Sequence, residues 1–504
     1  MESVIEGLSY FFWVAIALGI LVLIHELGHF LTARMFGMRV DAFSLGMPPN
    51  VFKKRFGDTE YRLGALPLGG YVSIAGMVDE SMRFPYEVEP VLDDNGDPVF
   101  DDDGDPMMRE VLDEYGKRIP ADLEPEPDEF RAKPVWQRMI VISAGVVFNV
   151  ILAFLIYSAL SFTYGRTYTP AENVALTVQE GSIADELGIE SGDRIVAFDN
   201  EPLESLSGVV VGFVSGAETI TVQRDGREVE LDIPSGMMTM MSRASRESGD
   251  EDPLTMLGLS EQLPAVLAGV TSGSAADDAG IRVGDRITRF AGEPVRLFGD
   301  LTALVAATGG EATTIEWARP LGAVSEDDPE PVRRTGELAI YQAEITPKPV
   351  GDRLLIGVAP DATVLGTKTE TLGLVGAVQA GARQTTDTIG LYVSIVGRLF
   401  SGQESVRDNL GGPLEIAKQS KESADRGGPS FWLFVAFLSI ALAVFNILPI
   451  PALDGGHIMF LIYEAVARRE PSLKVRMVVQ QIGLAMILVL MVFVIFNDAL
   501  RLFG

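Results

Sequence analysis

The chain has 504 residues, 47% of them hydrophobic, and a formal charge of −30. Such acidity excludes non-specific nucleic-acid binding, and the absence of cysteine excludes disulfides and thiolate metal sites. The length suffices for several domains. We expect no cleavable signal peptide, because the first residues, Met1-Glu2-Ser3, lack a basic segment.

The first apolar run, Leu8 to Leu31, contains the motif His25-Glu26-Leu27-Gly28-His29. Histidines four residues apart lie on one helix face and can hold one zinc ion, with Glu26 as general base toward water at the metal. A soluble buried helix with chance polar residues is the alternative. The run, however, exceeds the roughly 20 residues that span a bilayer, and ionisable residues inside a span are usually functional. We therefore predict a zinc site in a first transmembrane helix within 1–35.

Four apolar runs predict a polytopic α-helical membrane protein, with spans at roughly 8–32, 138–160, 430–449 and 477–496. Basic residues follow the first span and separate the third from the fourth: Arg34, Arg39, Lys53, Lys54, Arg55, Arg62, and then Arg468, Arg469, Lys474, Arg476. The positive-inside rule places both basic loops in the cytoplasm. Both termini and the segment 161–429 are then expected outside.

Residues 36–78 are predicted to form β-structure beside the first span. Val40 to Leu45 alternates between apolar and polar residues, and Tyr61 to Val72 resembles a strand interrupted by glycines. Gly69 and Gly70 would permit close backbone approach, and an exposed strand edge beside the metal could pair with an unwound substrate. A plain cytoplasmic hairpin is the alternative.

The segment 79–130 is predicted to be an acidic cytoplasmic insert, followed by the second transmembrane helix within 131–162. Residues 79–129 carry 19 acidic and four basic side chains. Runs at 91–96, 99–104 and 111–116 each suggest a short strand followed by an Asp/Gly turn. Calcium binding is the alternative to a solvated hairpin, but the spacing does not fit the twelve-residue EF-hand loop.

The outer segment contains an internal repeat. Val178 to Ile195 recurs as Val270 to Ile287, an offset of 92 residues, with Gly-Ser, a short helical stretch and Gly-Asp-Arg-Ile in both copies. This pattern is similar to PDZ domains of bacterial proteases, which we place at 167–258 and 259–350. That resemblance implies peptide binding at a sheet edge. Two rigid spacers are the alternative, and neither copy contains a Gly-Leu-Gly-Phe loop.

Residues 351–429 are predicted to form amphipathic and linker helices. Within 371–400, apolar residues recur at helical spacing. Such a helix either lies at the outer membrane surface or packs on the repeated domains.

Residues 430–504 hold the third and fourth spans and a candidate third ligand. Asp454 is an isolated carboxylate in an apolar region, and Pro449 and Pro451 are expected to end the third helix just before it. Unwound backbone at membrane depth requires surrounding protein or a water-filled cavity. The alternative for Asp454 is a helix cap. For His457 we favour a structural or outer-sphere role, because three ligands are already found.

Three features together resemble the site-2 protease family. They are the motif at 25–29, the sequence Leu453-Asp454-Gly455, and the repeats between the second and third spans. The similarity is to its bacterial, sigma-E-regulating type with tandem PDZ domains. Leu66 to Val72 is similar to the membrane-associated β-region of that family, and Asn409 to Pro413 to the segment before its third span.

The resemblance implies four transmembrane helices, a membrane-associated β-region and two extracytoplasmic PDZ-like domains in the cytoplasmic (inner) membrane, with the active site toward the cytoplasm. It implies cleavage within the transmembrane segment of a single-pass substrate, an anti-sigma factor after a first outer cut, and also signal-peptide remnants. It assigns substrate positioning to Asn446, with which we group Gly69, Gly70, Pro449 and Pro451. A second Asn typical of the family is missing from Ser439 to Phe445.

In the predicted mechanism, His25, His29 and Asp454 hold Zn²⁺, and Glu26 moves a proton from water to the leaving amine. Two other classes are a non-catalytic scaffold with structural zinc and a transporter. Structural zinc sites are usually closed by four protein ligands, whereas this one has three and a spare Glu. The chain contains no repeated pair of spans, and this argues against a transporter. The enzyme is therefore the favoured hypothesis.

Overall fold

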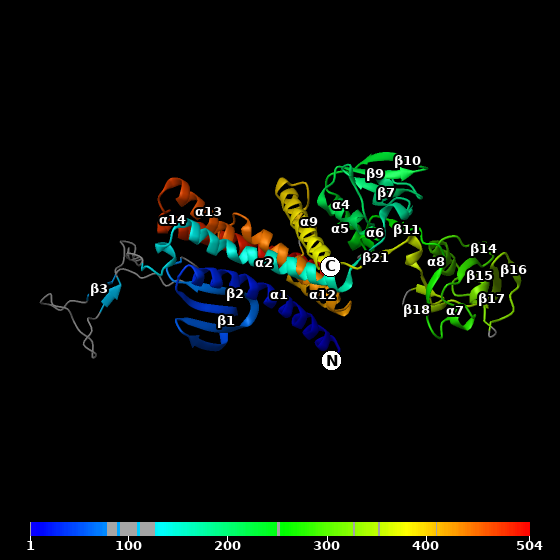
Figure 1. Cartoon of the computed structure of the whole chain (residues 1–504), viewed down its shortest axis with the longest axis horizontal. Coiled ribbons are helices and arrows are strands. Elements are labelled where there is room, and N and C mark those ends of the chain that lie inside the picture. Colours follow the sequence, from blue (N-terminus) through cyan, green and yellow to red (C-terminus); the bar gives the residue numbers. More distant parts are fainter. Residues whose placement is uncertain are drawn as a thin grey trace. The chain divides into compact units, whose positions relative to one another are not determined.

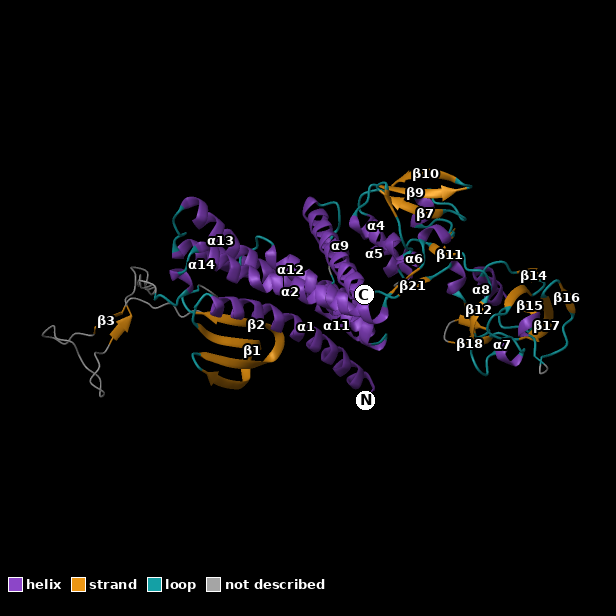
Figure 2. Cartoon of the chain, in the orientation of Figure 1, coloured by secondary structure: helices purple, strands orange, loops and turns teal. Residues whose placement is uncertain are grey.

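A computed structural model describes residues 2–77, 88–90, 108–110, 126–248, 252–325, 328–350, 353–409 and 411–503 (Figures 1 and 2). It divides into two units: one comprises 1–159, 379–389 and 411–504, the other 160–378 and 390–410. The acidic hairpins predicted at 91–96, 99–104 and 111–116 lie outside the described residues. Within the insert, β3 (Val88–Pro90) pairs antiparallel with β4 (Met108–Glu110).

Four helices of the first unit are long and apolar enough to cross a membrane: α1 (Glu2–Met35), α2 (Val135–Tyr164), α12 (Gly428–Ile447) and α14 (Leu473–Phe503). Their candidate spanning stretches are Ser9–Met35, Val135–Tyr164, Gly428–Ile447 and Val478–Asp498, so the four predicted apolar segments are confirmed as helices to within a few residues. A buried cluster joins α1 to α12 through Ala17, Leu21, Phe431 and Val435.

The loop after α12 positions the next helix, α13 (Asp454–Ala467). The third span ends at Ile447, just before the two prolines, as their missing N–H groups and restricted neighbours require. The loop then turns tightly, with Ala452 at a φ of 78°. A Cβ on Gly455 would collide with the carbonyl oxygens of Ile447 and Leu448. This packing sets Asp454 as the first residue of α13.

The β-region of the first unit consists of two long bent strands, β1 (Val40–Phe56) and β2 (Thr59–Ile74). Because both bend back, Ala42 pairs with Glu60 on one side and Ser73 on the other. The resulting sheet has the order 70–74, 40–45, 60–64, 50–56. Alternate residues of β1, beginning with Val40, are buried, which confirms the predicted β-structure. Residues 70–74 therefore form an outer strand.

The second unit contains two similarly built halves (Figure 1). The first consists of β6 (Leu176–Val178), α3 (Ile183–Glu186), β7 (Arg194–Phe198), β8 (Glu201–Pro202), α4 (Ser207–Ser215), β9 (Thr219–Arg224), β10 (Arg227–Asp232), α5 (Met237–Ser248), α6 (Pro253–Met256) and β11 (Leu259–Glu261). The second consists of β12 (Leu267–Val270), α7 (Ala275–Asp278), β13 (Arg286–Phe290), β14 (Glu293–Pro294), α8 (Phe298–Ala307), β15 (Thr313–Pro320), β16 (Arg333–Thr335), β17 (Leu338–Ile345), β18 (Lys348–Val350), β19 (Arg353–Leu355) and β20 (Val358–Pro360). Their sheets have the orders β10-β9-β7-β8 and β14-β13-β15-β17-β16, and each half has its own apolar core.

The repeated Gly-Asp-Arg-Ile motif is structural in both halves. Its carboxylates, Asp193 and Asp285, are buried, and each is paired with an arginine of the neighbouring strand, Arg224 and Arg319 respectively. Because buried charges must be paired, one ionic contact per half accounts for the repeated motif.

The chain enters the two halves of the second unit and leaves them side by side. β5 (Arg166–Tyr168), which follows α2, pairs antiparallel with β21 (Lys368–Glu370). The predicted helix at 371–400 is observed as α9 (Leu374–Ser401), of which 379–389 belong to the first unit. Within the second unit, the Ser394 hydroxyl donates to the Ser215 carbonyl, so this part of α9 packs on the first half. The last helices before α12 are α10 (Val406–Asn409) and α11 (Pro413–Asp425).

Candidate metal centre

Three side chains from two helices converge inside the first unit. His25 and His29 come from α1, and Asp454 from the first turn of α13. The Nε2 atoms of the two histidines are 3.2 Å apart, and Asp454 Oδ2 lies 3.2 Å from the first and 3.6 Å from the second. The side chains of both histidines are 10% exposed. The structure thus brings together the three residues predicted as ligands.

The triangle of donor atoms fits a zinc ion. Tetrahedral zinc with ligand bonds of about 2.0–2.1 Å sets its ligands about 3.3 Å apart, close to the observed 3.2, 3.2 and 3.6 Å. Among the described residues, none donates a well-formed hydrogen bond to the buried Asp454 Oδ2. Such an orphaned oxygen is costly unless a cation satisfies it. Two imidazoles and one carboxylate leave a fourth position open, as in catalytic zinc sites.

Groups of α2 orient both imidazoles. His29 Nδ1 lies 2.8 Å from the Val141 carbonyl, so this nitrogen carries the proton and Nε2 keeps its lone pair. His25 Nδ1 faces the Asn149 side-chain amide at 3.3 Å, while the amide oxygen is buried without a partner in the described part of the chain. Because amide oxygen and nitrogen are assigned from hydrogen bonding, we assign the oxygen toward His25, where it accepts from Nδ1–H. Both Nε2 atoms then face the metal position.

Glycines allow α1 and α2 to meet at the site. A Cβ on Gly145 of α2 would lie 2.5 Å from His29 Nε2 and 2.6 Å from His25 Cε1. A Cβ on Gly28 would lie 2.5 Å from the Ala144 carbonyl oxygen. The sequence analysis missed Gly145 and Asn149. The signal available was an Asn, with a Gly one turn before it, inside an otherwise apolar span.

Glu26 faces the outer strand of the β-region. The Val72 backbone N–H lies near its carboxylate, which also interacts electrostatically with both histidines and Asp454. A Cβ on Gly70 would lie 3.0 Å from Glu26 Cγ and 2.7 Å from the Ser44 carbonyl oxygen. The absence of a side chain at Gly70 thus lets the strand edge approach the glutamate closely.

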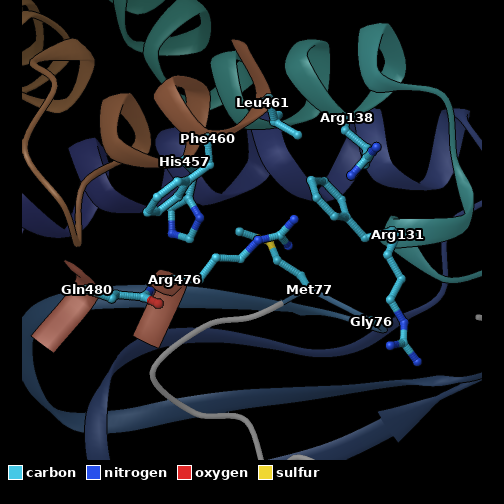
Figure 3. Close-up of a pocket in the computed structure, with 10 residues that line it drawn as sticks. Gly76, Met77, Arg131, Arg138, His457, Phe460, Leu461, Arg476 and Gln480 are labelled. Atoms are coloured by element: carbon cyan, nitrogen blue, oxygen red, sulfur yellow. The ribbon is translucent and has the colours of Figure 1, made fainter. Parts of the chain in front are cut away.

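The remaining predicted residues divide between the site and its surroundings. Asn446 reaches the site, with its side-chain nitrogen 3.3 Å from His25 Nε2. Gly69, at a φ of 138°, forms the bend before the outer strand. Pro449 lies in the loop after α12, and the Pro451 carbonyl contacts Gly483 of α14. His457 lines a separate cavity rather than the metal position (Figure 3).

Comparison with known proteins agrees with this geometry. The family model of peptidase family M50 matches residues 13–490. The regulator of sigma-E protease of Escherichia coli is 30% identical over 505 residues, covering 97% of each chain. The Haemophilus influenzae protein of the same name is 29% identical over 499 residues, covering 97% of this chain and 98% of its own. The Salmonella typhimurium protein is 29% identical over 520 residues, covering both chains completely.

One explanation accounts for the family match over nearly the whole chain, the four apolar helices and the donor set suited to zinc. The chain belongs to peptidase family M50, the site-2 proteases, and is a zinc metalloprotease of that type.

Proposed function

We propose that this protease hydrolyses a peptide bond within the transmembrane segment of a single-pass membrane protein. The observation that carries the proposal is the convergence of His25, His29 and Asp454 among apolar helices, beside a glutamate and an open strand edge. Relatives named for sigma-E regulation support an anti-sigma factor as the substrate, already cut once outside the membrane. We also propose signal-peptide remnants as substrates.

In this proposal His25, His29 and Asp454 are the protein ligands of zinc. Zinc held there would supply a Lewis acid that activates water and polarises the scissile carbonyl. Glu26 accepts the proton of the attacking water and returns it to the leaving amine. Val141 and Asn149 hold the imidazoles in the tautomer with a free Nε2.

The outer strand is proposed to bind the substrate. A transmembrane helix hides its carbonyls in internal hydrogen bonds, so the substrate must unwind before cleavage. An unwound segment would add to the edge at 70–74 and so pair its backbone beside Glu26. The Val72 N–H lies near Glu26 on this edge, and the absence of a side chain at Gly70 leaves access to it open.

Substrate positioning also includes the end of the third span. The Asn446 amide can donate to a substrate carbonyl next to His25. Gly69 provides the bend, and Pro449 and Pro451 keep the loop non-helical.

The two halves of the second unit are proposed to be PDZ-like domains at 167–258 and 259–350, facing outside in the inner membrane. The active site then faces the cytoplasm, as the basic loops after the first span and before the fourth favour. The domains would exclude substrates with large outer portions and admit trimmed ones.

The test is cleavage of a single-pass substrate, truncated on its outer side, by the full chain in detergent. Glu26→Gln should reduce cleavage by about 10²–10⁴-fold, the usual contribution of general acid–base catalysis, while zinc content stays at one per chain. Glu201→Gln, on the exposed strand β8, is the matched control and should cut like wild type. Cleavage by Glu26→Gln at the wild-type rate would remove Glu26 from the mechanism.

A further inference from the structure

The third span, α12, carries one polar side chain in the face that packs inside the first unit. Structure is described for the whole of this helix, and its buried residues are Phe431, Val435, Ala436, Ser439, Ile440, Ala443 and Val444. Ser439 is 0% exposed. A hydroxyl buried among apolar side chains is costly unless it forms a hydrogen bond. Ser439 therefore requires a partner, and no role described above uses this residue.

The partner of Ser439 belongs to a different helix. The Ser439 hydroxyl donates to the Asn149 carbonyl of α2, the neighbouring helix in Figure 2, over a distance of 2.8 Å. A serine inside a helix commonly donates to the carbonyl four residues earlier on its own helix. Serine hydrogen bonds between transmembrane helices instead hold the two helices together. Ser439 thus fixes α12 to α2 at the level of Asn149.

Asn149 also supports the metal centre. Its side-chain amide contacts His25 Nδ1 at 3.3 Å, while its backbone carbonyl accepts from Ser439. The residue is itself 0% exposed. Asn149 therefore connects α12 to the His25 imidazole through two hydrogen bonds, one from its backbone and one from its side chain.

Asn446 lies on the same side of α12 as Ser439. The two residues are seven positions apart, close to two helical turns of 3.6 residues each. The Asn446 side-chain nitrogen is 3.3 Å from His25 Nε2, the other nitrogen of the same ring. One asparagine from α2 and one from α12 thus contact the two nitrogens of His25, and Ser439 sets the position of one helix along the other.

We propose that Ser439 is a positioning residue of this protease. Its hydrogen bond to α2 holds Asn446 beside the metal position, where Asn446 contacts the substrate. This inference rests on the proposed function of Asn446. Loss of the bond would let α12 shift along α2, and a displacement of about 1 Å can cost about 100-fold in rate. The metal ligands come from α1 and α13, so zinc content should not change.

The first test is a double-mutant cycle of cleavage by the full chain in detergent. Ser439→Ala should lower kcat about tenfold, because Asn446 is still present but displaced. Asn446→Ala should lower kcat at least as much, and the double variant should cut at the rate of Asn446→Ala alone. Independent losses that add in the double variant would overturn the proposal. Loss of zinc from Ser439→Ala would also overturn it, because Ser439 would then act on the metal ligands.

Two control variants separate the hydrogen bond from packing. Ser439→Cys occupies nearly the same space but donates only weakly, so it should lower kcat as Ser439→Ala does. Ser430→Ala removes a hydroxyl nine positions earlier on the same helix and should cut like wild type. Wild-type cleavage by Ser439→Cys would show that the hydrogen bond is not needed and would overturn the proposal.

Substrate binding gives a readout that does not depend on cleavage. In the Glu26→Gln background, a fluorescent single-pass substrate truncated on its outer side should bind about fivefold more weakly after Ser439→Ala, the effect of one hydrogen bond. Asn446→Ala should weaken binding similarly, and the double variant no further. A wild type that fails to cut this substrate would overturn the proposed function. A wild type that cuts, with Ser439→Ala unchanged in cleavage and binding, would overturn this inference alone.

Discussion

Two buried clusters of ionisable side chains in this chain have opposite chemistry. In the second half of the second unit, Arg319 lies 2.7 Å from Asp285 and 2.6 Å from Asp328, and each of these side chains is at most 2% exposed. In the membrane unit, His25, His29 and Asp454 direct three electron-pair donors at one point. The first cluster joins charges of opposite sign, whereas the second brings together three electron-pair donors suited to a metal cation. The first group therefore stabilises the fold, and the second is suited to bind a ligand.

The largest effect is expected from removing a ligand of the metal cluster. Asp454→Asn should lose at least about 1000-fold in zinc affinity, because free energies of roughly 10–16 kcal/mol are shared by three or four ligands. The stability of the second unit should not change. Metal content after dialysis against graded chelator measures the effect, and retention of full zinc affinity would show that Asp454 is not a ligand.

The next largest effect is expected from removing the arginine of the ionic cluster. Arg319→Met leaves Asp285 buried without its cation and Asp328 with Arg282 alone, and should cost about 3–5 kcal/mol in that half, with no change in zinc content. Buried Trp317, stacked on Tyr341, reports unfolding by fluorescence once the other three tryptophans are replaced by Phe.

The control for this experiment replaces all three residues by apolar ones of similar size. Arg319→Met combined with Asp285→Leu and Asp328→Leu should recover most of the lost stability, because no buried charge remains unpaired. A triple variant as unstable as the single one would mean that packing, not charge, holds this region.

The sequence was sufficient to predict the spans and to select the three residues that converge. A run of twenty or more apolar residues usually indicates a membrane helix, and a histidine or aspartate within it is rare enough to indicate function. The β-region was predictable because Val40 to Leu45 alternates with one buried face. Each of these inferences depends on local order in the chain.

The positions that sequence reasoning missed depend on contacts between distant segments. Gly145 and Asn149 are 116 or more positions from His29 along the chain, and only the crossing of α1 and α2 brings them to the imidazoles. The folding of two strands into a four-segment sheet, with Ala42 paired on both sides, depends on bends that composition does not specify. His457 follows the ligand motif in sequence, yet it lines a different cavity.

A smaller effect is expected from a change in packing against the metal cluster. Gly145→Ala forces a methyl group against both imidazoles and should cost about 1–3 kcal/mol and weaken zinc binding. Gly19→Ala, on α1 with no atom within 4 Å of the added carbon, is the matched control and should be neutral or stabilising. Thermal unfolding and zinc titration of both variants measure the difference, and equal behaviour would contradict the close crossing.

The smallest effect is the response of the ionic cluster to acid. The Ser325 backbone N–H, followed by the Arg319 guanidinium, lowers the pKa of Asp328. The lowered pKa contributes stability that is fully present above the unfolded value of about 3.9 and is lost as pH falls through the folded value. Trp317 fluorescence of zinc-free protein should therefore show declining stability below about pH 4. Asp328→Asn should reduce this pH dependence, and an unchanged acid profile would contradict the assignment.

The pairing of β5 with β21 makes the two halves of the second unit a removable cassette. Tyr168 and Lys368 are direct partners across the ladder, so the chain leaves these halves where it entered them, and only residues 390–410 of α9 and α10 return to the second unit. A two-residue turn is enough to join antiparallel strands, and the 199 residues between these two positions could be exchanged without moving either neighbouring strand. Evolution can thus exchange these two halves while the helices that carry the metal ligands keep their sequence and connections.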